Sequence, residues 1–127
     1  MDRKVELMVL LLKWTLMALA GYFALVAAAH MSGMKIPLLF VYYNVESHAY
    51  QDKIISFLMF GWAAFFFTTA LDPLRYLAFV RASLVAGIGA VAALSFINLS
   101  TDFNSISTDA TSGPFWIETG ILGLVVA

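Results

Sequence analysis

Residues 7–29, LMVLLLKWTLMALAGYFALVAAA, form an apolar run with a single charged side chain, that of Lys13. A helix of about 20 apolar residues crosses the hydrocarbon core of a bilayer, which is roughly 30 Å thick. The run therefore predicts a membrane-spanning helix. A secretory signal peptide has a shorter apolar core, although the alanines at 27–29 leave cleavage before His30 as an alternative.

Three more apolar stretches follow, at residues 54–71, 82–99 and 115–127. Asp72 resembles a helix cap, and Pro73 resembles a first helical residue. This pattern predicts that the third helix begins near residue 74. We therefore expect one all-α domain, residues 1–127, folded as an integral membrane four-helix bundle. The expected spans are 7–29, 54–71, 74–99 and 114–127. The last is short, so we expect the natural protein to continue and complete it.

The composition agrees with a membrane protein: 62% of the residues are hydrophobic, 12% are charged, and the mean hydropathy is +0.90. The chain has no cysteine, which excludes disulfides and thiolate metal sites. Its net charge is −1 and it has no basic cluster, so a nucleic-acid partner is not expected.

The seven basic residues predict the orientation, because Lys and Arg favour the cytoplasmic side of short loops. One side of the predicted bundle would carry Arg3, Lys4, Lys13, Arg75 and Arg81, and the other would carry Lys35 and Lys53. We therefore expect a cytoplasmic N-terminus in a bacterial-type inner membrane.

Two aromatic regions allow more than one interpretation. Residues 36–43, IPLLFVYY, are apolar but too short to span, so we expect them to lie in the membrane interface or, alternatively, to form a lid over a cavity. Aromatic side chains nearly encircle the second helix. These side chains can face lipid, or they can line a site for a flat apolar ligand such as a quinone. The residues concerned are Phe57, Phe60, Trp62, Phe65, Phe66 and Phe67.

Small residues recur every four positions on the first and third helices, a spacing that lets helices approach closely in lipid. The two stripes are Ala20, Ala24 and Ala28, and Ala82, Ala86 and Ala90, the second continued by Gly89 and Ala93. We expect the stripes to meet inside the bundle. They can instead mark a contact with another subunit.

The polar residues that map to the outer half of the membrane are the candidate ligand-binding residues: Glu118, Asn98, His48 and Asp52. A carboxylate within a span, such as that of Glu118, usually faces the protein interior and needs a partner. The simpler alternative is that Glu118 stabilises the positive end of its own helix. His30 and Glu46 lie in the same leaflet, but no helical spacing of metal ligands is present, so we predict no metal site and no catalytic residue.

Asp52 at the head of the second span, Asn98 at the end of the third, and Trp116 with Glu118 at the start of the fourth carry a resemblance that covers most of the chain. In these positions the chain resembles small four-span bacterial inner-membrane proteins of unknown function, broadly DoxX-like. The resemblance implies a four-helix bundle without an established activity, and it supplies no catalytic residue.

These observations predict a small non-catalytic membrane protein that is an accessory or assembly subunit of a membrane complex, or a homo-oligomer. Its partners would be the lipid bilayer and other membrane subunits or itself. The alternative is a binding protein or enzyme for an apolar ligand such as a quinone or lipid, with an outward-facing polar pocket. A transporter would require oligomerisation, and the chain has no internal repeat. The sequence identifies no cofactor.

Overall fold

The computed structural model describes residues 2–40, 48–106, 108 and 110–127. Within these residues the chain is helical and contains no strand, which confirms the all-α prediction. The helices are α1 (Arg3–Ser32), α2 (Ala49–Leu71), α3 (Leu77–Ser100), the short α4 (Phe103–Ile106) and α5 (Ser112–Val126).

Three of these helices, α1, α2 and α3, are long and apolar enough to cross a membrane. Their 30, 23 and 24 residues exceed the length that a bilayer core requires. The stretch predicted as a fourth span is the shorter apolar helix α5, whose 15 residues rise about 22 Å. The structure therefore supports a membrane protein with three candidate spans.

The ends of the long helices follow from local chemistry. The Asp2 carboxylate accepts a hydrogen bond from the Lys4 backbone N–H and caps α1. Gly33, at φ 70°, ends α1 in the left-handed conformation that glycine adopts without a steric penalty. Asp72 caps a turn formed by residues 73–76, since its carboxylate accepts from the Arg75 N–H. As a result α3 begins at Leu77, later than residue 74.

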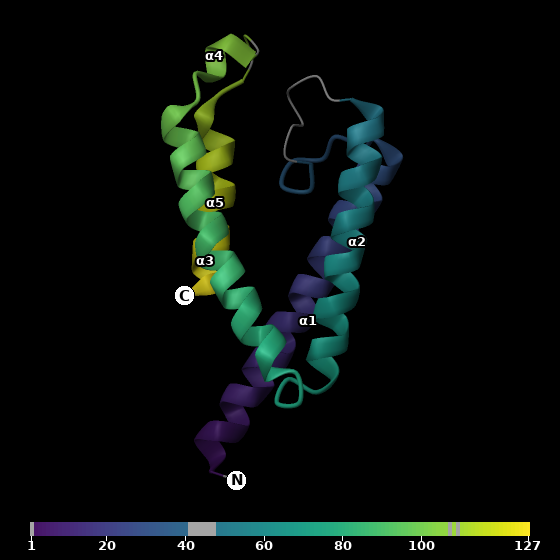
Figure 1. Cartoon of the computed structure of the whole chain (residues 1–127), viewed down its shortest axis with the longest axis vertical. Coiled ribbons are helices and arrows are strands. Elements are labelled where there is room, and N and C mark those ends of the chain that lie inside the picture. Colours follow the sequence, from purple (N-terminus) through teal and green to yellow (C-terminus); the bar gives the residue numbers. More distant parts are fainter. Residues whose placement is uncertain (1, 41–47, 107, 109) are drawn as a thin grey trace.

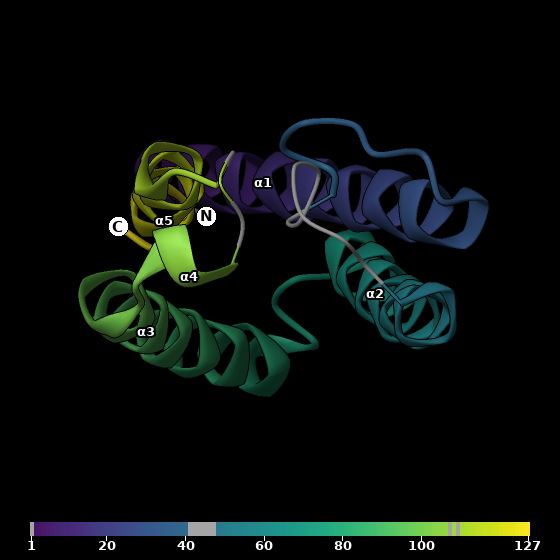
Figure 2. The ribbon, with the colours of Figure 1, turned by 90° about the horizontal axis from the view of Figure 1, so that it is seen from above.

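The helices pack as two hairpins, α1 along α2 and α3 along α5 (Figures 1 and 2). The N-terminus and the turn between α2 and α3 lie at one end of the molecule, and α4 lies at the other (Figure 1). From the shared turn α2 and α3 diverge, so the arrangement is more open than the four-helix bundle that the sequence predicts. Ring contacts of Phe79 with Phe65 and Phe66 hold the hairpins together near the turn.

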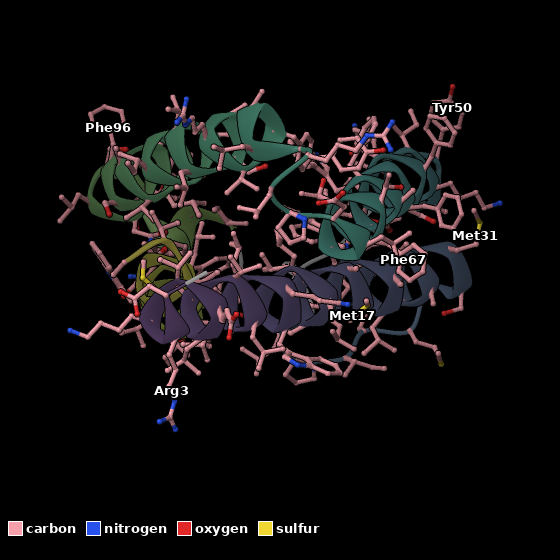
Figure 3. The ribbon with its side chains drawn as sticks, turned by 90° about the horizontal axis from the view of Figure 1, so that it is seen from below. Arg3, Met17, Met31, Tyr50, Phe67 and Phe96 are labelled. Atoms are coloured by element: carbon pink, nitrogen blue, oxygen red, sulfur yellow. The ribbon has the colours of Figure 1, made fainter. Side chains whose placement is uncertain are left out.

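The apolar core lies where the two hairpins meet. It consists of Leu16 and Ala20 from α1, Phe66 and Ala70 from α2, and Val80 from α3. Most of the remaining apolar side chains face outward, as Tyr50 and Phe96 do (Figure 3); these two are 77% and 72% exposed. Such a surface suits lipid rather than water.

The predicted contact between the two small-residue stripes is not seen. Ala20 is buried, but Ala24 and Ala28 are exposed, because α1 packs along α2. Ala82 and Ala86 on α3 are also exposed, and Ala90 is half-buried.

Candidate functional site

The most buried ionisable group is His30, in the last turn of α1, with 1% of its surface exposed. Its Nδ1 lies 3.6 Å from a carboxylate oxygen of Asp52, in the first turn of α2. The imidazole stacks on the ring of Phe40, with a centroid separation of 4.0 Å and an interplanar angle of 13°. A buried imidazole and a buried carboxylate from neighbouring helices thus lie together, and Phe40 covers the imidazole.

The chain after α1 folds back to form this cover. Phe40 is fully buried, and its N–H donates to the Ile36 carbonyl in a tight turn. Leu38 in that turn has a φ of 68°, a conformation that costs a non-glycine residue about 1–2 kcal/mol. The Tyr22 hydroxyl donates to the Leu38 carbonyl at 2.8 Å and fastens the turn to α1. Residues 41–43 of the predicted interfacial segment lie outside the described residues.

The His30–Asp52 pair joins α1 to α2, and its separation is slightly longer than a hydrogen bond. Neither ring nitrogen of His30 has a hydrogen-bond partner among the described residues. Within the described part of the chain no three His, Asp or Glu side chains gather as a metal-binding group.

Asn98 makes the corresponding contact in the other hairpin. Its side-chain amide donates to the Thr119 hydroxyl at 3.0 Å, and that hydroxyl donates to the Phe115 carbonyl at 2.7 Å. Asn98 and Thr119 are 7% and 5% exposed, so this neutral contact links α3 to α5 inside the protein. Sequence reasoning selected Asn98 but missed Thr119, whose only signal was a polar residue beside Glu118 in an apolar helix.

The side chains of the other two predicted site residues take no part in these two contacts. Glu118 is half-buried on α5. His48 directly precedes α2, is exposed, and makes no side-chain capping bond. Glu46 lies outside the described residues. The structure therefore places Asp52 with His30 and Asn98 with Thr119, and it does not bring Glu118, Asn98, His48 and Asp52 into one pocket.

A cavity of about 340 Å³ lies between the two hairpins, lined by residues of α1, α2, α3 and α5. Its lining includes Phe23, Trp62 and Phe66 on one side and Ala86 and Ala90 on the other, and none of the four predicted site residues. This volume is at the lower end of the range of small-molecule pockets. A polar hollow of about 380 Å³ near α4 contains Asn98 but not the other three predicted residues.

Comparison of the chain with protein-family models, curated proteins and solved structures finds no match. The DoxX-like resemblance therefore stays a hypothesis, and the function is argued from the geometry of this chain.

Proposed function

We propose that the protein is a small non-catalytic integral membrane protein that associates with itself or with another membrane subunit through the outer face of α3. The observation that carries this proposal is the exposure of a continuous stripe of small residues. Ala82, Ala86, Gly89 and Ala93 recur at the spacing of one helix face, and all four are exposed, with Ala86 at the border between this face and the cavity.

Small residues on a lipid-facing surface offer little contact to acyl chains but allow a second helix to approach closely. At Gly89 an added Cβ would meet no atom within 4 Å, so this face is open. Only 6% of the most apolar window of α3 is buried, compared with 28% for α2. Val85 and Phe96 flank the stripe and are both 72% exposed, which provides larger side chains to pack around a partner helix.

The arrangement of basic residues supports a cytoplasmic N-terminus in a bacterial-type inner membrane. Arg3 and Lys4 begin α1, and Arg75 and Arg81 lie at the turn and the start of α3, at the same end of the molecule (Figure 1). The Arg75 guanidinium lies 5.7 Å from the centre of the Tyr76 ring. A cationic group beside an aromatic ring suits the membrane interface.

The dispersed polar residues favour this function over a catalytic one. Asp52 and Asn98 each bridge two helices, and the side chains of Glu118 and His48 take no part in these contacts. General acid–base catalysis needs groups within hydrogen-bond reach of one substrate, an arrangement that these four residues do not provide. Helix pairing explains the burial of Asp52 and Asn98 without a reaction.

Native mass spectrometry of the protein released from lipid nanodiscs tests the proposal. We expect the wild-type protein to appear as an oligomer or with a co-purifying membrane subunit, well above the chain mass of 13.9 kDa. The double variant Gly89→Leu/Ala93→Leu should yield the single chain, because leucines keep a second helix away. Ala64→Leu, at an exposed position on α2, is the matched control and should leave the assembly intact. A wild-type single chain, or a double variant that assembles like the control, would overturn the proposal.

A further inference from the structure

Among the residues that line the cavity between the hairpins, Ser83 has a hydroxyl group whose environment differs from that of several other helical hydroxyls. Ser83 lines the cavity, and its Oγ is buried without a hydrogen-bond partner among the described residues. Thr68, Thr69 and Ser95, in contrast, donate to the carbonyl one turn earlier. That local bond is the usual arrangement for a hydroxyl in a helix, so Ser83 retains an unused donor on a residue that lines the cavity.

The cavity also has an aromatic wall. The ring of Phe66 stacks on Phe23 at 5.5 Å with an interplanar angle of 20°, and on Trp62 at 5.8 Å with an angle of 29°. The three rings are therefore close to parallel. Aromatic faces arranged in this way favour an offset-stacked planar guest. The lining includes no charged residue, which favours a neutral guest.

We propose that this cavity binds a neutral, lipid-soluble planar ring compound that carries a carbonyl oxygen. The ring packs against Phe23 and Phe66. The Ser83 side chain, whose Oγ is covered in this structure, rotates about its Cα–Cβ bond so that its hydroxyl donates a hydrogen bond to the carbonyl oxygen. Ser83 lies about 9 Å along α3 from Leu77, within the apolar part of this candidate span. A bare acyl chain would leave the hydroxyl without a partner. The site goes beyond the proposed function, because it does not use the exposed positions Gly89 and Ala93.

Quenching of Trp62 fluorescence by menadione, a planar ring compound with carbonyl groups, tests the assignment in lipid nanodiscs. The protein carries Trp14→Phe and Trp116→Phe so that Trp62 alone reports. We expect saturable quenching, and competition by methylnaphthalene, which lacks the carbonyl, only at several-fold higher concentration. A Trp14-only protein should show unsaturable quenching, because Trp14 is 62% exposed and lies outside the cavity.

Substitutions at Ser83 and Ala90 distinguish the contribution of the hydrogen bond from that of the cavity volume. Ser83→Ala should raise the Kd for menadione about five-fold and leave methylnaphthalene unchanged, as expected for loss of one hydrogen bond. Ser95→Ala, whose hydroxyl bonds to the Val91 carbonyl, should change neither. Ala90→Phe should abolish saturable quenching by filling the cavity, with circular dichroism verifying that the helices remain. Unsaturable quenching of Trp62 in the parent protein, or an unchanged Kd in Ser83→Ala, would overturn the proposal.

Discussion

The two hairpins are built from similarly apolar sequences but differ in how much they bury. Helices α1 and α2 each bury six residues, whereas α3 buries two and α5 one. In a membrane, hydrophobicity alone does not drive helices together, because lipid is as apolar as leucine. The difference therefore reflects packing and polar contacts. The hairpin of α1 and α2 has its own internal interface, and the hairpin of α3 and α5 leaves most of its surface for lipid or a partner.

The two hairpins also differ in the chemistry of their polar contacts. His30 and Asp52 are ionisable and buried, and the ring of Phe40 stacks on His30. Asn98 and Thr119 are neutral, and Thr119 keeps its bond to the Phe115 carbonyl whatever Asn98 does. The first contact should therefore contribute more to stability than the second.

Removing the Asp52 carboxylate tests the larger contribution. Asp52→Ala leaves His30 buried without a polar partner, and we expect the free energy of unfolding to fall by about 2 kcal/mol. The measurement is reversible unfolding in mixed bicelles followed by steric trapping. His48→Ala is the control, since His48 is exposed next to the same helix end and makes no capping bond. Equal effects of the two variants would show that the buried pair does not stabilise this hairpin.

Glycine-to-alanine substitutions test the second hairpin at two positions on one helix. A Cβ at Gly87 would lie 2.6 Å from Val126 Cγ2 of α5, whereas at Gly89 it would meet nothing within 4 Å. Overpacking costs typically 1–3 kcal/mol, so Gly87→Ala should destabilise the protein by about 1.5 kcal/mol.

Gly89→Ala is the control for the same chemical change, and we expect it to be neutral or slightly stabilising because alanine favours the helix. Unfolding by sodium dodecyl sulfate, monitored by circular dichroism, compares the two variants. Similar stabilities would show that α3 and α5 tolerate a wider separation than the structure has.

Hydropathy predicted the membrane helices because the signal is local. The run at 7–29 lies within α1, and the extra residues Arg3–Glu6 and His30–Ser32 are polar helix ends that an apolar window excludes. The start of α2 at Ala49 was missed for the same reason, since Gln51, Asp52 and Lys53 interrupt the apolar pattern. A local pattern identifies a helix but says little about its neighbours.

Pairing depends on contacts between distant residues, and here sequence reasoning was less successful. It selected Asp52 and Asn98 as polar candidates but not the partners His30 and Thr119, which depend on how α1 meets α2 and α3 meets α5. The cavity was also missed, because it exists only where the two hairpins diverge. Of the aromatic residues of the second helix, Phe66 is buried and stacks on Trp62, whereas Phe57, Phe60 and Phe67 are exposed.

The smallest expected effect comes from the polar contact of the second hairpin. Asn98→Ala should lower the free energy of unfolding by about 0.6 kcal/mol, the average for a hydrogen bond between membrane helices. A double-mutant cycle with Thr119→Val isolates the contact, since each single variant also changes local packing. Ser95→Ala, which removes only a hydroxyl bonded within α3, is the control. A coupling energy near zero would mean that apolar packing alone joins α3 to α5. A value as large as the effect of Asp52→Ala would remove the contrast between the hairpins, because α3 and α5 would then be held as firmly as α1 and α2.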